Sequence, residues 1–269
     1  MSVYNFLKLE KLLRATWIYP AMKPVFCLSR CFGLMHSFHE GKLNVPLLIY
    51  NAALLIVTDS VYIFYVTEWL KESAHTVVSF GIVLQSVCSV ACNIIAFYIC
   101  LVKARSLQDI FNTLNGLHRY LIHPTCVYSE VRRNLILQIV VSVLGTIISL
   151  VVSWQSVGGD VYLIHVYGTF FISETCNVAM ELQYVGFVLI LRRHFVEVNT
   201  FLKTSCRVTR RMVVATVKYH DCLCDVVDTV NSTYSLFVLL SVTKMFMSVS
   251  CTLFIVLMRH YIPEMHEHL

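Results

Sequence analysis

Long apolar runs constrain this chain more than any other feature of its sequence. About five runs of roughly twenty mostly apolar residues are long enough to cross a hydrocarbon core of about 30 Å. They cover about residues 43–67, 77–102, 134–156, 161–190 and 234–258. Their length and continuity favour helices over the short alternating strands of a membrane β-barrel. The sequence therefore predicts an all-α fold, a multi-pass transmembrane helix bundle in a lipid bilayer.

The composition argues against a water-soluble globule. Charged residues make up 14% of the chain and the mean hydropathy is +0.70, whereas soluble domains carry about 25% charged residues. The first forty residues mix basic and apolar positions, so we expect no cleaved signal peptide. Since no linker or repeat divides the chain, we predict a single membrane domain over residues 1–269.

The basic residues alternate with the spans. They concentrate before the first span, between the second and third, and between the fourth and fifth. The opposite loops, near 68–76 and 157–160, contain only Lys71. Because basic residues in short loops stay on the cytoplasmic side, this pattern predicts a cytoplasmic amino terminus and an outer carboxyl terminus. A nucleic-acid patch would not follow the loops, so we expect no nucleic-acid partner.

The two long stretches between spans on the cytoplasmic side, 103–133 and 191–233, are expected to be helical. In the first stretch, apolar residues recur at the spacing of an amphipathic helix. These residues are Leu107, Ile110, Phe111, Leu114, Leu117 and Leu121. In the second, the fourth span continues past Arg192, and residues 212–231 lead into the fifth. We therefore expect long helices that project below the membrane.

Polar residues inside the spans are expected to face the bundle interior, a cavity or a partner, because they are costly in lipid. They are Asp59, Gln85, Asn93, Glu174 and Glu181. Glu174 falls in the outer half of the bilayer with Trp154, His165 and Tyr167, and these four are the candidate ligand-binding residues of a small-molecule pocket. The alternative is that the aromatic residues form an interfacial belt and that a neighbouring helix satisfies Glu174.

Nothing in the sequence argues for catalysis, and we expect neither a cofactor nor a metal. No Walker, nucleophile-elbow, HExxH or dinucleotide-binding pattern occurs. His220, Cys222 and Cys224 are close in sequence, but two cysteines at this spacing splay apart on a helix and no second cluster completes a tetrahedral site. The sequon at Asn231 lies on the predicted cytoplasmic side, so we expect it to be unmodified.

Three stretches of the chain resemble the insect gustatory receptor family. Residues 23–34 look like that family's Lys-Pro, Ser-Arg, Gly-Leu opening before the first span. Residues 191–202 are similar to its Arg-x-Phe-x-x-x-Asn-x-x-Leu signature, here with Arg193, Phe195, Asn199 and Leu202. A helical pattern that leads into the fifth span follows, made of His220, Leu223, Val227, Asn231, Tyr234 and Leu240.

The resemblance implies a chemosensory, tastant-gated cation channel of the cell membrane. Members of that family have seven spans, assemble as homo- or hetero-tetramers and bind a small-molecule tastant in an outward-facing pocket. Their last span carries a Thr-Tyr…Gln-Phe pore signature, whereas this chain ends at Leu269, past its fifth predicted span. The resemblance therefore implies an incomplete receptor. The alternatives are a non-channel membrane protein that co-assembles with full-length receptors, or a transporter.

Overall fold

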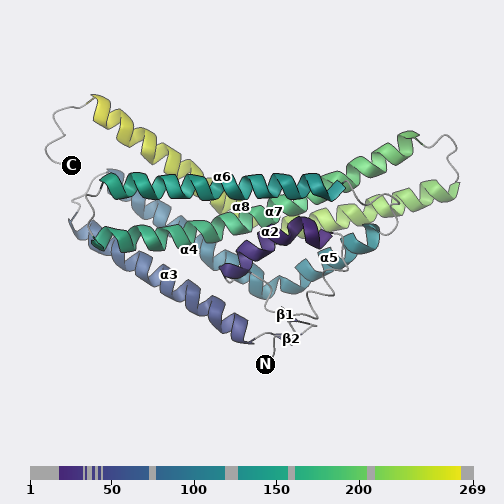
Figure 1. Cartoon of the computed structure of the whole chain (residues 1–269), viewed down its shortest axis with the longest axis horizontal. Helices are drawn as coiled ribbons and strands as arrows, with labels where there is room; N and C mark the ends of the chain where they lie inside the picture. The colour runs from purple at the N-terminus through teal and green to yellow at the C-terminus, as the bar shows by residue number, and fades with distance from the viewer. Residues whose placement is uncertain are drawn as a thin grey trace.

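The computed structural model describes residues 18–32, 34, 38–39, 42–43, 45–72, 77–118, 127–156, 161–204 and 210–261. Within these residues the chain is almost entirely helical (Figure 1). The helices are α2 (Ile18–Cys31), α3 (Val45–Glu72), α4 (Val77–Val102), α5 (Ala104–His118), α6 (Val127–Ser156), α7 (Val161–Thr204) and α8 (Arg210–Tyr261). Strands β1 (Phe38–His39) and β2 (Lys42–Leu43) pair antiparallel. The all-α prediction is confirmed, with this two-residue ladder as a small addition.

Four of the described helices are long enough and apolar enough to cross a membrane. Their segments are Ile49–Glu68, Val83–Val102, Tyr128–Ile148 and Met212–Ser250. Each overlaps one of the predicted spans, and the chain is a multi-pass helical membrane protein. Large apolar side chains stay exposed along α3, α6 and α8, among them Ile56, Val141 and Leu239, as expected of surfaces that face lipid.

The fourth predicted span, 161–190, falls in α7, which is not among those four segments. Glu174, Glu181 and Gln183 lower the apolarity of this helix. The packing explains why α7 carries them, because it contacts α2, α3, α4, α6 and α8 and so turns much of its surface toward protein. That α7 also crosses the membrane stays a prediction.

The amphipathic helix expected after the second span is present as α5. Leu107, Ile110 and Leu114 are buried against the rest of the bundle, while Leu121 lies outside the described residues. The predicted extensions of the fourth and fifth spans are also helical, as the continuous helices α7 and α8. Figure 1 shows these two helices running on together past the other helices at one end of the molecule.

Helix α2 was not expected, because it contains Pro24, and proline is disfavoured inside a helix. One of its faces is nevertheless buried, through Met22, Val25 and Phe26, and it packs against α6 and α7. Met22 lies directly over Gly186 of α7, where a Cβ would overlap Met22 Sδ and lie 2.6 Å from Met22 Cε. The absence of a side chain at Gly186 therefore lets α2 dock onto α7.

Replacing Gly186 by Ala is expected to destabilise the protein by about 1–3 kcal/mol, because the added Cβ would force the fully buried Met22 side chain to shift within the core. Gly145→Ala on α6 is the matched control, since nothing lies within 4 Å of its added Cβ. In a helix this change is expected to be stabilising by about 0.5–1 kcal/mol. Thermal unfolding in lipid nanodiscs measures the stability of both variants. Equal melting temperatures for Gly186→Ala and Gly145→Ala would contradict the close α2–α7 contact.

Candidate functional site

A largely buried ion pair joins α7 to α8 within the bundle. Lys244 Nζ lies 2.6 Å and 2.7 Å from the two carboxylate oxygens of Glu174. The side chains of Lys244 and Glu174 are only 11% and 21% exposed. An ammonium and a carboxylate are retained inside an apolar bundle only when they neutralise each other. Each charge therefore depends on the other for its place in the bundle.

Three helices, α3, α4 and α7, meet at an amide beside this pair. Asn93 on α4 donates one hydrogen bond to Asp59 Oδ1 on α3, at 2.7 Å, and another to Ser173 Oγ on α7, at 2.9 Å. All three side chains are buried. Because Ser173 directly precedes Glu174, the hydrogen-bonded group and the ion pair are adjacent along α7. Together they link α3, α4, α7 and α8 through polar contacts.

More polar contacts between the same helices extend this network. Tyr62 and Ser86 share a hydrogen bond of 3.1 Å between α3 and α4, and Gln85 donates to Ser248 Oγ at 3.5 Å between α4 and α8. Ser241 on α8 donates to Glu181 on α7. We call the ion pair and these hydrogen-bonded residues the central polar network. The prediction that the polar residues of the spans face the bundle interior is confirmed.

Of the four predicted ligand-binding residues, the structure describes the side chain of Glu174 alone. Trp154 lies in α6, and His165 and Tyr167 lie in α7, but their side chains are outside the described part of the chain. Sequence reasoning missed Lys244, the partner of Glu174. Its signal is a single basic residue inside an otherwise apolar run, since lysine within a span needs a counter-charge.

A second buried cluster ties α6, α7 and α8 together near the predicted cytoplasmic side. His194 is 1% exposed, and its Nδ1 and Nε2 lie 2.7 Å from the Tyr219 hydroxyl and 3.3 Å from the Tyr128 hydroxyl. Arg193, which directly precedes His194, pairs at 3.4 Å with Glu197, one turn further along α7. Burial raises the pKa of the Glu197 carboxyl, and the Arg193 charge and hydrogen bond counteract this rise.

The residues that carried the family resemblance also connect α7 to α8. The Phe195 ring meets the His220 imidazole edge-on, with 5.6 Å between ring centroids. Tyr234, which is fully buried, donates a hydrogen bond of 3.1 Å to Gln183 Oε1. These signature positions therefore hold the two long helices in register.

Within the described residues, no group of three His, Cys, Asp or Glu side chains is placed to hold a metal ion. His220 Nδ1 lies 3.7 Å from Cys224 Sγ, one turn away on α8. Cys222 lies on another face of the same helix. The HDCLC stretch therefore does not gather its three possible ligands at one point.

Comparison with known families gives a match over nearly the whole chain. Residues 22–268 match the family described as 7tm Chemosensory receptor. No curated protein matches the chain, and no solved structure does. The matched range includes all the described helices from Met22 of α2 onward, and so the whole central polar network.

Proposed function

Because the chain belongs to the 7tm chemosensory receptor family, we propose that it is a gustatory receptor, a subunit of a tastant-gated cation channel in the cell membrane. The family match over residues 22–268 is the observation that carries this proposal. The central polar network adds support, because charged residues within a membrane bundle usually serve ligand binding or gating as well as structure. No enzymatic role is proposed.

We place tastant recognition on the outer side of the network, at Glu174 with Trp154, His165 and Tyr167. Both oxygens of Glu174 are taken up by Lys244. A tastant that bonds to Glu174 would therefore compete with an ammonium group and loosen the link between α7 and α8. This exchange would couple ligand binding to a movement of the two helices that run toward the cytoplasm. A polar or hydrogen-bonding tastant suits such a site.

The proposed orientation keeps the amino terminus cytoplasmic, as the basic loops predict. The α7 and α8 extensions then lie below the membrane. Exposed apolar side chains on them include Phe201, Leu202 and Val213. Apolar groups of this size facing water are typical of protein interfaces. We propose that these extensions join subunits in a homo- or hetero-tetramer with other gustatory receptors.

Current recordings test the function. The chain is expressed alone and together with a full-length receptor of the same family, and a panel of tastants is applied while surface protein is quantified. We expect co-purification of the two chains and a tastant-evoked cation current that differs from that of the partner alone.

Co-purification without any change in current would favour the alternative of a non-channel partner protein. If the chain reached the surface but neither bound a family member nor changed any current, the proposal would be wrong.

A further inference from the structure

The α8 extension carries an exposed stripe that faces away from the rest of the bundle. Its members recur three or four residues apart, so they lie on one face of the helix. They are Val214, Val217, Asp221, Asp225 and Asp228, all of them exposed. The opposite face is buried, through Leu223, Val226 and Val230. We call Asp221, Asp225 and Asp228 the acidic row.

The acidic row has no counter-charge within the described part of the chain. None of its three carboxylates makes an ion pair there, not even with the exposed Lys218 beside them. Like charges one turn apart destabilise a helix, and the anionic lipids of a cytoplasmic leaflet would repel them further. The row therefore calls for a positively charged protein surface.

Three exposed arginines on the neighbouring helices form such a surface. Arg132 and Arg133 lie near the start of α6, and Arg192 lies on α7. Among the residues that the structure describes, none of the three pairs with a carboxylate. We call these arginines the basic patch. The chain thus presents three unpaired cations and three unpaired anions.

The basic patch and the acidic row lie at the same height along the bundle. His194 contacts both Tyr128 and Tyr219, which places these three residues of α6, α7 and α8 at one level. From this level, a rise of about 1.5 Å per residue puts the arginines about 3–7 Å away and the aspartates about 3–13 Å away. Both α6 and α8 run antiparallel to α7, so all six side chains lie on the same side of the level.

The two surfaces lie on different sides of α7. Helix α6 packs against α2 and α7, whereas α8 packs against α4, α5 and α7. The His194 ring reaches Tyr128 through Nε2 and Tyr219 through Nδ1, so α7 stands between the other two helices. The row and the patch are therefore not placed to neutralise each other within one chain, but two copies side by side can bring them together.

We propose that the acidic row of one copy of this chain binds the basic patch of the next copy, head to tail. This proposal rests on the subunit assembly in the proposed function and names the surfaces that carry it. Because every copy offers both surfaces, the same contact can repeat by rotation and close a ring. The charges set the partner and the register, and Val214 and Val217 add apolar area at one end of the stripe.

Charge reversal tests this contact on the whole chain in a neutral detergent, which keeps anionic lipid from competing for the arginines. The row variant carries Asp221→Lys with Asp225→Lys, and the patch variant carries Arg133→Glu with Arg192→Glu. Native mass spectrometry measures the oligomeric state across protein concentrations. We expect either variant alone to assemble at least about tenfold more weakly than the wild type, because like charges then meet. Asp109→Lys on the exposed face of α5 is the matched control and should assemble normally.

A mixture of the row variant and the patch variant should recover assembly, because each reversed surface then meets its opposite charge on the other chain. Misfolded protein could not produce this recovery. A wild type that stays monomeric, variants that assemble as well as the wild type, or a mixture that stays dissociated would each overturn the proposal. An assembly that forms as expected but passes no tastant-evoked current would support this contact and contradict the proposed function instead.

Discussion

Glu174→Ala is expected to destabilise the folded protein by about 3–5 kcal/mol, the usual cost of leaving one charge of a buried pair without its partner. Lys244 is 8% exposed, so its ammonium has little access to water once the carboxylate is gone. Thermal or denaturant unfolding in nanodiscs measures the loss. Lys244→Met is expected to be similarly destabilising, because it leaves the Glu174 carboxylate unpaired.

The double variant Glu174→Leu with Lys244→Met removes both charges and is expected to recover most of the stability. Glu68→Ala is the matched control, because the Glu68–Lys71 pair on α3 has the same chemistry but side-chain exposures of 37% and 69%. Breaking an exposed pair costs at most about 1 kcal/mol. Additive losses in the double variant would contradict the pairing of Glu174 with Lys244.

Gln183→Leu is expected to produce the second large loss of stability. The Gln183 amide donates to Ser29 Oγ at 2.7 Å and to the Leu34 carbonyl at 3.3 Å, and it accepts from the Tyr234 hydroxyl. Leucine has a similar size but leaves these buried groups unpaired. Each orphaned group costs about 1–3 kcal/mol, so we expect a total loss above about 2 kcal/mol.

Gln108→Leu on the exposed face of α5 provides the control for this change, and we expect its melting temperature to stay close to that of the wild type. A second readout tests the connection itself. Because Gln183 ties the end of α2 to α7 and α8, amide hydrogen exchange in α2 should speed up in Gln183→Leu. An unchanged exchange rate in α2 together with an unchanged melting temperature would refute this role.

The sequence predicted the helices wherever a simple period or a long apolar run specified them. The spans were predicted from the length and apolarity of their sequences, and α5 was predicted from the helical spacing of Leu107, Ile110 and Leu114. Helix α2 was missed although Met22, Val25 and Phe26 have helical spacing, because Pro24 within it argues against a helix. Its burial depends on a groove beside Gly186 that exists only in the folded bundle.

The sequence predicted which polar residues of the candidate site face the bundle interior, but not which of them pair with one another. Asp59, Asn93, Glu174 and Glu181 were expected to face the interior, and all of them make contacts between helices. Which residues pair depends on how each helix is rotated and shifted along its neighbour, and sequence spacing does not encode this. Lys244 was missed although it is a single basic residue in an apolar run, and only its pairing with Glu174 lay beyond the sequence.

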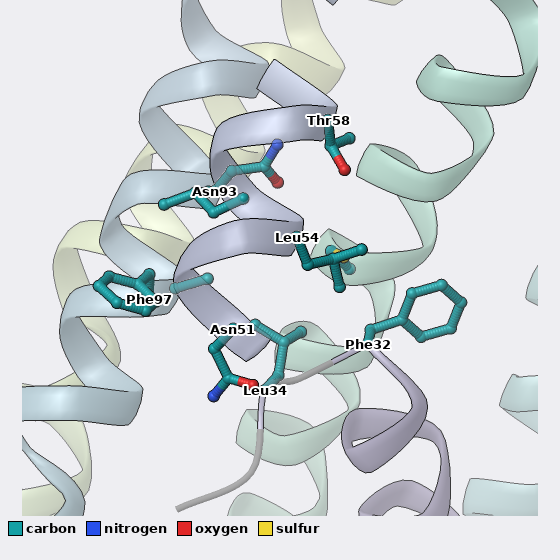
Figure 2. A pocket seen from close by; sticks show the side chains of 10 residues that line it. Phe32, Leu34, Asn51, Leu54, Thr58, Asn93 and Phe97 are labelled. Carbon is teal, nitrogen blue, oxygen red and sulfur yellow. The ribbon is translucent and has the colours of Figure 1, made fainter. Parts of the chain in front are cut away.

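The position of a pocket was also hard to predict from the sequence. A ligand pocket was expected on the outer side, near Trp154 and Glu174, and it stays a proposal. The cavity that the structure shows lies elsewhere, between α3, α4 and α7 (Figure 2). It arises from side chains of several helices whose arrangement no single-helix pattern predicts.

The most direct test of the account is the tastant dose–response curve of the co-expressed current for Glu174→Gln. Glutamine removes the charge and keeps a hydrogen-bond acceptor for Lys244, and recognition is compared only in protein that has folded and reached the surface. At equal surface amounts, we predict a several-fold shift in the half-maximal tastant concentration, and no shift for Glu130→Gln at the exposed start of α6. Coinciding curves for wild type and Glu174→Gln would contradict recognition at this site.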